Sequence, residues 1–86
     1  MRIQVVLTGR SYHLAASTPE WLELQEGASV NDAISVLSGM LADGTSLPPS
    51  CLIAVSGDHL GTLAKHESRT LREGDELAVI APVAGG

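Results

Sequence analysis

A single helix-length apolar stripe constrains the fold of this chain more than any other feature of its sequence. Its members recur at helical spacing and are Val30, Ala33, Ile34, Leu37 and Leu41. Ser29 is a suitable N-cap for this helix, Asp32 falls in its first turn, and Asp43-Gly44 is expected to close it. A helix with one apolar stripe must bury that stripe, so we expect it to lie across a sheet.

Strand-like segments stand on both sides of this helix. Ile3, Val5 and Leu7 alternate with their neighbours, which is the period-two pattern of a strand with one buried face. Two further apolar runs, at residues 51–56 and 76–81, have the length and composition of strands. These segments supply the sheet on which the helix is expected to pack.

A short strand is also predicted at residues 21–25, with Leu22 and Leu24 facing the core and Trp21 on the opposite face. An outward tryptophan has two interpretations. A loop could cover it in part, or it could anchor a partner protein, because tryptophan is enriched at the centres of interfaces. Trp21 is therefore a candidate partner-binding residue.

The connecting segments complete the fold prediction. Pro48-Pro49 places a non-helical connector before residue 51, and turns are expected at residues 57–58 and 72–75. Residues 59–70 are weakly patterned and leave room for one more strand. The order β-β-α-β-(β)-β in so short a chain indicates an α+β fold of two layers, with one sheet and one main helix on a single face.

Length and composition exclude several functional classes. A chain of 86 residues is one domain, and no apolar run approaches the roughly 20 residues of a membrane span, so a soluble, cytoplasmic protein is expected. The net charge of −5 argues against nucleic acid as a partner and favours a basic protein. The lone Cys51 permits no internal disulfide and is interpreted as a small buried hydrophobic residue.

Other candidate sites have simpler explanations. His13, His59 and His66 show no metal-ligand spacing with one another or with Cys51, so no metal site is expected. The run Ser56-Gly57-Asp58-His59 contains the residue types of a hydrolytic triad, but neighbours within one turn cannot normally form the relay. A turn is the preferred interpretation of that run.

The end of the chain carries the clearest chemical signal. An apolar run at residues 77–81 leads directly into Pro82, Val83, Ala84, Gly85 and Gly86. We therefore expect a domain at residues 1–81 and a flexible tail at residues 82–86. Because glycine lacks Cβ, such a tail can enter a narrow pocket of a partner enzyme. Once ATP has converted the terminal carboxylate to an acyl adenylate, a sulfur nucleophile can displace AMP.

These features together resemble the β-grasp sulfur carriers, and most closely the small subunit of molybdopterin synthase, the MoaD type, which is related to ThiS-type carriers. The resemblance is carried by the helix entry at residues 26–30, the Leu-x-x-Gly-Asp-Glu turn at residues 71–76 and the ending at residues 82–86. It covers essentially the whole chain. It implies a ubiquitin-like fold with a mixed sheet of four to five strands, one main helix and an extended diglycine tail.

The resemblance also implies a function and partners. An E1-like activating enzyme would consume ATP to adenylate Gly86, and a sulfur donor system would convert it to a thiocarboxylate. In the molybdopterin branch the tail, with Pro82, Val83, Ala84 and Gly85 as its lead-in, would enter a MoaE-type large subunit of the synthase. The chain would then be a sulfur-donating subunit without a catalytic site of its own, and no bound cofactor is expected.

Three alternatives remain open. The sulfur could serve thiamine thiazole, cysteine or another thio-metabolite. The chain could instead be a protein modifier like ubiquitin, whose terminal glycine ends in an isopeptide bond to lysine. It could also be an interaction module with an inert tail. Fold and tail are common to all of these, so the sequence does not choose among them.

Overall fold

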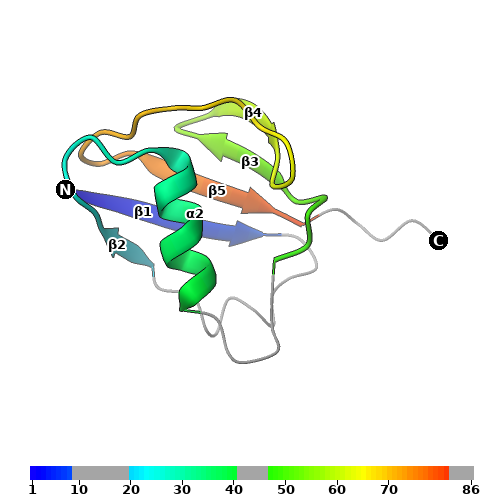
Figure 1. Ribbon diagram of the computed structural model, residues 1–86, viewed down its shortest axis with the longest axis horizontal. Coiled ribbons are helices and arrows are strands. Elements are labelled where there is room, and N and C mark those ends of the chain that lie inside the picture. The colour runs from blue at the N-terminus through cyan, green and yellow to red at the C-terminus, as the bar shows by residue number, and fades with distance from the viewer. Residues whose placement is uncertain (9–19, 41–46, 82–86) are drawn as a thin grey trace.

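The computed structural model describes residues 1–8, 20–40 and 47–81. These residues form a five-stranded sheet with one helix lying across one of its faces (Figure 1). The described elements are, in chain order, β1 (Arg2–Thr8), β2 (Trp21–Glu23), α2 (Val30–Gly39), β3 (Leu52–Val55), β4 (Asp58–Thr62) and β5 (Glu76–Ile80). The two-layer α+β architecture predicted from the sequence is confirmed.

The sheet is mixed and has the strand order β2-β1-β5-β3-β4. β1 and β5, the first and last strands, run parallel at its centre, with Thr8 opposite Ile80. The other neighbouring pairs are antiparallel. Because β1 and β5 are parallel, both strands end at the same edge of the sheet.

Apolar residues from α2 and from one face of the sheet form the core. Its largest fully buried side chains are Ile3, Leu22, Leu37, Ile53, Leu77, Val30, Val55, Val79 and Cys51. The alternation in β1 and the helical stripe from Val30 to Leu37 therefore face each other, as predicted, and Leu41 lies outside the described residues. Cys51 is buried among these residues, and its burial raises the pKa of the thiol. The interpretation of Cys51 as a core residue is confirmed.

The start of α2 is closed by a capping box. The Ser29 hydroxyl accepts a hydrogen bond from the Asp32 N–H at 3.2 Å, and the Asp32 carboxylate accepts one from the Ser29 N–H at 2.9 Å. The end of the helix differs from the prediction. α2 ends at Gly39, and the Met40 N–H donates to the Leu37 carbonyl at 3.1 Å. This tighter turn closes the helix ahead of Asp43-Gly44, which lies outside the described residues.

The strands at residues 21–25 and 51–56 are shorter than predicted. β2 ends at Glu23 because the turn at residues 26–27 follows closely, and Leu24 packs beside the core without joining a strand. β3 spans Leu52–Val55, and the turn expected at residues 57–58 lies at Ser56 and Gly57, whose φ angles of 48° and 90° suit a tight hairpin.

The weakly patterned segment at residues 59–70 contains most of β4, the additional strand for which the sequence left room. β4 was hidden because a β-bulge beside Ile53 and Ala54 breaks the alternation between β3 and β4, and Leu60 is the one residue of β4 that is buried. In the described part of the chain, no helix is both long enough and apolar enough to cross a membrane.

Candidate functional site

The predicted reactive segment begins where the described chain ends. Pro82, Val83, Ala84, Gly85 and Gly86 lie outside the described residues, so their roles stay predictions. The root of the tail is described. The Ala81 N–H donates to the Thr8 carbonyl at 3.0 Å, and the Ala81 side chain is buried. The residue that precedes the tail is therefore held to the centre of the sheet.

Three neighbouring strands meet at this root. β5 reaches it at Ile80, which pairs with Thr8 at the end of β1 and with Leu52 at the start of β3. All three side chains point away from α2, because their neighbours along each strand face the core. A partner that took residues 82–86 into a pocket would have to contact the surface around these residues.

The sheet face that α2 leaves uncovered, here called the open face, extends from this root across the sheet. Besides the charged residues Arg2, Glu23 and Glu76, its residues are Gln4, Val6, Thr8, Trp21, Leu52, Ala54, Ala78 and Ile80. Most of them are small or apolar, and Leu52 is a large apolar residue with 40% of its surface exposed. An exposed apolar residue beside the tail root marks this part of the open face as a candidate contact surface.

Trp21 shares the open face but lies away from the tail root. It pairs with Gln4, and Gln4 and Thr8 are about 13 Å apart along β1 at about 3.3 Å per residue. The guanidinium carbon of Arg2 is 5.7 Å from the centroid of the Trp21 ring, a cation–π distance. Trp21 is 44% exposed, so both a packing and a partner role fit it. Its role as a partner anchor stays a prediction.

Leu52 is the candidate contact residue that sequence reasoning missed. The signal was present, because Ile53 and Val55 are the inward residues of the third strand and period two then turns Leu52 outward. The run at residues 51–56 is apolar on both faces, however, and gives no contrast between them. Only the pairing of Leu52 with Ile80 shows that it lies beside the tail root.

Of the two described histidines, His66 has a structural role, and the His59 side chain makes no hydrogen bond within the described residues. No metal-binding group of His, Cys, Asp or Glu occurs among residues 1–8, 20–40 and 47–81; His13 lies outside them. The His66 ring joins two elements, with Nδ1 2.9 Å from the Thr62 carbonyl oxygen and Nε2 2.6 Å from the Asn31 amide oxygen. His66 thus ties the loop after β4 to the first turn of α2.

The triad-like run forms a hairpin turn at Ser56 and Gly57, as predicted, and its last two residues, Asp58 and His59, begin β4. The Ser56 hydroxyl donates to the Asp75 carboxylate at 2.8 Å and not to His59. It also accepts from the Glu76 N–H at 3.3 Å, so Ser56 fixes the β3–β4 hairpin to the start of β5. This arrangement supports the sheet and offers no nucleophile.

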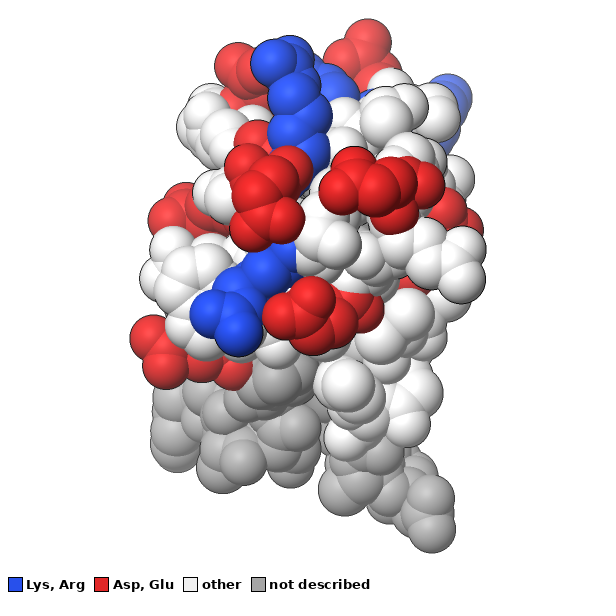
Figure 2. Space-filling view, turned by 90° about the vertical axis from the view of Figure 1, so that its left-hand side faces the viewer, with Lys and Arg blue, Asp and Glu red and all other residues white. Residues whose placement is uncertain are grey.

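Charged side chains gather at the end of the molecule where β1 begins, away from the tail root. Figure 2 shows that end, with Asp and Glu side chains on several sides of the Lys and Arg side chains. Arg2 forms an exposed ion pair with Glu23 at 3.1 Å, and its backbone N–H donates to Glu73 at 3.0 Å. The two ends of the molecule therefore differ: one carries charged side chains of both signs, and the other presents the apolar surface beside the tail root.

Comparisons with known proteins agree with this architecture. The family model described as "ThiS family" matches residues 5–86. A protein of Chlamydomonas reinhardtii named "Molybdopterin synthase sulfur carrier subunit" is 26% identical over 86 residues, and the similarity covers 100% of both chains. The match to the family model runs through the strands, the helix and the diglycine ending alike.

Proposed function

This chain belongs to the ThiS family of β-grasp sulfur carriers, and from that premise we propose that Gly86 is the residue that carries the sulfur. The observation that carries the proposal is the extent of the family match, which includes the terminal glycines. The anchored root at Ala81 supports it, because the body stays folded while residues 82–86 can extend roughly 16 Å at about 3.3 Å per residue.

The chemistry needs little from the carrier itself. The Gly86 carboxylate attacks the α-phosphorus of ATP, pyrophosphate leaves, and an acyl adenylate forms in the active site of an E1-like activating enzyme. Hydrosulfide supplied by a donor system then attacks the acyl carbon, displaces AMP and loses its proton, which leaves a thiocarboxylate. The carrier contributes the carboxylate and a slender tail, and the partners supply ATP and sulfur.

The proposed destination of the sulfur is molybdopterin. The full-length similarity to a molybdopterin synthase sulfur carrier subunit supports this pathway over the other sulfur-carrier pathways. In this role the chain is the small subunit, and its tail enters a MoaE-type large subunit that builds the dithiolene from two thiocarboxylates. Carriage for thiamine thiazole or another thio-metabolite, and modification of protein lysines, are the alternatives.

Partners that take the tail are proposed to dock on the open face beside its root. Thr8, Ile80 and Leu52 surround the point where the chain leaves the sheet, and the Leu52 side chain is 40% exposed there. Because the Leu52 side chain is already partly buried, burying its exposed part in an interface contributes roughly 1 kcal/mol. The same surface serves the activating enzyme and the large subunit in turn, since both must receive the same tail.

Intact mass measurement tests the carrier role directly. The protein and a variant lacking Gly86 are incubated with ATP, a sulfur donor and an E1-like enzyme from the same source. We expect a mass gain that corresponds to one carboxylate oxygen replaced by sulfur, in the full chain alone. An unchanged mass with an activating enzyme that is active on its own carrier would overturn the proposal, and higher-mass conjugates would favour a protein modifier.

The pathway has a separate test. Thiocarboxylated protein is mixed with a MoaE-type large subunit and cyclic pyranopterin monophosphate, and the product is assayed as molybdopterin. Formation of molybdopterin with loss of the added sulfur mass supports the assignment. If the sulfur is retained there but is transferred by a thiazole synthase, the carrier role stands and the pathway assignment is wrong.

A further inference from the structure

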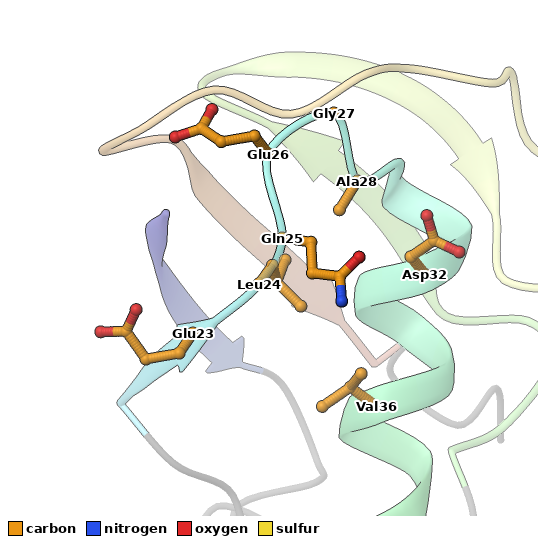
Figure 3. Close-up of a pocket in the computed structure, with 8 residues that line it drawn as sticks. All are labelled: Glu23, Leu24, Gln25, Glu26, Gly27, Ala28, Asp32 and Val36. Atoms are coloured by element: carbon orange, nitrogen blue, oxygen red, sulfur yellow. The ribbon is translucent and has the colours of Figure 1, made fainter.

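A groove lies on the helix side of the molecule, between α2 and the loop after β2 (Figure 3). Its volume is about 440 Å³, and its lining residues are Glu23, Leu24, Gln25, Glu26, Gly27, Ala28, Asp32 and Val36. In Figure 3 Leu24 and Val36 lie on opposite sides of the hollow, while Glu23 and Glu26 project outward from its rim. The groove thus has an apolar floor and a polar rim.

The apolar floor is exposed. Val36 points outward from α2 with 39% of its surface accessible, although the buried stripe of the helix lies on its other side. Leu24 comes toward it from the loop and is only partly buried against the core. Together they offer an apolar strip between two walls, a shape that a flat surface with scattered apolar residues does not have.

The rim is acidic. The charged lining residues are Glu23, Glu26 and Asp32, and none is basic. Glu23 forms an exposed ion pair with Arg2, and the Asp32 carboxylate accepts a hydrogen bond from the Ser29 N–H. Glu26 forms no hydrogen bond or ion pair with another residue of the described part of the chain. Its carboxylate is therefore available to an external cation.

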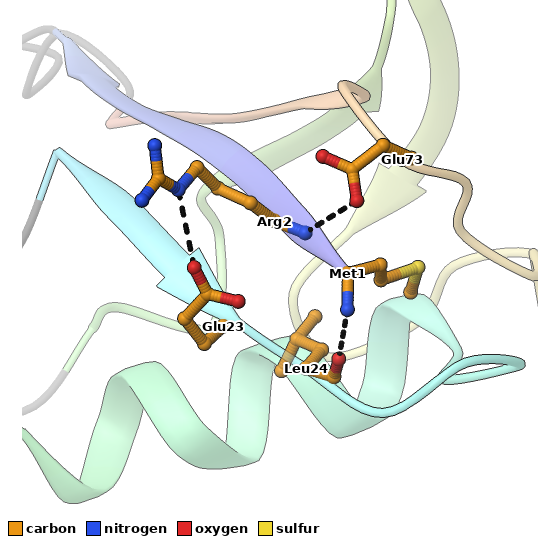
Figure 4. A network of polar contacts seen from close by, with 5 residues as sticks. All are labelled: Met1, Arg2, Glu23, Leu24 and Glu73. Carbon is orange, nitrogen blue, oxygen red and sulfur yellow. Dashed lines mark hydrogen bonds and ion pairs between the residues drawn. The ribbon is translucent and has the colours of Figure 1, made fainter.

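The loop wall of the groove is held in place. The Met1 ammonium nitrogen donates to the Leu24 carbonyl at 2.6 Å (Figure 4). The Leu24 N–H donates to the Met1 carbonyl at 2.7 Å. On the other wall, the capping box fixes the first turn of α2. Because both walls are tied to the fold, the groove is preformed and binding costs little in organising it.

From this shape and charge we propose that the groove docks a basic, extended segment of a partner protein. A lysine or arginine side chain has an apolar stem and a cationic head. The stem would lie over Leu24 and Val36, and the head would reach the carboxylate of Glu26 on the rim. Glu23 is turned away from the groove in its ion pair with Arg2. A second copy of this chain does not suit the groove, because at a net charge of −5 two copies repel each other.

The groove lies away from the tail root. It adjoins Glu23 and Leu24, which contact the first residues of β1, whereas the tail root adjoins Thr8 at the end of that strand. A protein docked in the groove would leave the open face beside the root uncovered. Such a protein could bind the chain while the tail is inside another protein. Binding of a basic segment in the groove does not depend on the proposed chemistry of the tail.

A peptide titration tests the groove in the full chain. The probe is the acetylated and amidated peptide Lys-Leu-Lys-Leu-Lys, followed by two-dimensional ¹⁵N–¹H NMR, with Glu-Leu-Glu-Leu-Glu as the matched acidic control. We expect saturable shifts at Gln25, Gly27, Ala28 and Val36 with the basic peptide only. The proposal would be overturned by shifts spread over the amides of acidic residues elsewhere in the protein. Equal shifts with the acidic peptide, or no shifts with either peptide, would also overturn it.

Three variants sharpen the test. Glu26→Gln removes one rim charge and should weaken binding about two- to five-fold, the effect of one exposed ion pair. Glu67→Gln removes another exposed carboxylate, outside the groove, and should leave the affinity unchanged. Val36→Lys places a cation on the floor and should abolish binding while the dispersed spectrum of the folded protein is retained. Equal weakening by Glu26→Gln and Glu67→Gln, or undiminished binding by the Val36→Lys variant, would contradict a defined groove.

Discussion

At the scale of single residues, Gly61 is the glycine, among those the structure describes, with the least room for a side chain. It lies in β4 with φ of 134°, and a Cβ built on it would stand 2.5 Å from the Lys65 carbonyl oxygen. The close approach arises because the chain doubles back here, and the Thr62 N–H donates to that same carbonyl at 2.8 Å. Glycine is required at this position for its missing side chain as well as for its backbone angle.

Gly61→Ala should therefore destabilise the protein more than Gly74→Ala. Gly74 also has a positive φ, of 84°, but nothing lies within 4 Å of a Cβ built on it. A positive φ alone costs a residue with a side chain about 1–3 kcal/mol, and the clash at Gly61 should add about 1–3 kcal/mol. Urea denaturation of both variants measures the difference, and equal midpoints would show that the loop at Lys65 relaxes freely.

Cys51 gives a prediction about pH. Burial raises the pKa of its thiol in the folded state, so the folded protein retains the proton to higher pH than the unfolded chain does. The contribution to stability is complete below the unfolded thiol pKa of about 8–9 and is lost as pH rises through the folded value. Cys51→Ser, which does not ionise in this range, should show a flatter decline in the free energy of unfolding above about pH 9.

A thiol reagent gives an independent check on Cys51. The native protein should react slowly and the protein in denaturant rapidly, because reaction requires an exposed thiolate. Rapid native reaction near neutral pH would contradict the burial of Cys51 and would place it among accessible groups.

At the scale of elements, the ends of α2 differ in how they are stabilised. The start is closed twice, by the Ser29 hydroxyl and by the Asp32 carboxylate. The end carries no basic residue in its last turn and closes through backbone hydrogen bonds from Met40. The first turn of α2 also forms one wall of the groove. The rigidity of this turn therefore matters to the proposed docking as well as to the helix.

Ser29→Ala should lower the free energy of unfolding by about 0.5–2 kcal/mol, because it leaves the Asp32 N–H without its capping acceptor. Ser35→Ala is the matched control, since Ser35 is an exposed residue in the middle of the same helix. Alanine has the higher helix propensity there, so Ser35→Ala should be neutral or slightly stabilising. Chemical denaturation of both variants measures the contrast, and equal losses would rule out the cap as the cause.

At the scale of the whole molecule, the two proposed contact surfaces lie apart. The tail root and Leu52 lie at the edge of the sheet where β1 and β5 end. The groove adjoins the start of β1 and the other layer of the fold. The rigid sheet and helix separate them, so we expect the two surfaces to act independently.

Paired variants test this independence. Leu52→Asp should slow thiocarboxylate formation by the activating enzyme about ten-fold or more, the effect of losing an interface anchor, and should leave binding of the basic peptide unchanged. Val36→Lys should abolish binding of the basic peptide and leave the rate of thiocarboxylate formation unchanged. Both residues are substantially exposed, so thermal melting should be little altered. Loss of both activities in either variant, with the fold intact, would show that the surfaces are coupled.

Local pattern was enough for most of the fold. The alternation in β1 and the stripe of α2 record directly which side chains are buried, so strand, helix and two-layer class could be inferred from the sequence. The capping role of Ser29 followed from its type and position. The resemblance in the tail and the turn at residues 71–76 indicated the family that the comparison supports.

Tertiary pairing decided the rest. β4 became visible only through its ladder with β3, because its bulge removes the alternation that would have indicated it. Leu52 became a site residue only when pairing set it beside Ile80 at the tail root. The groove needed Leu24 and Val36 to face each other across two elements. Burial of one face of a helix or strand produces a periodic pattern of apolar residues in the sequence. Proximity between residues far apart in the sequence produces no such pattern, because it depends on the register in which the strands pair.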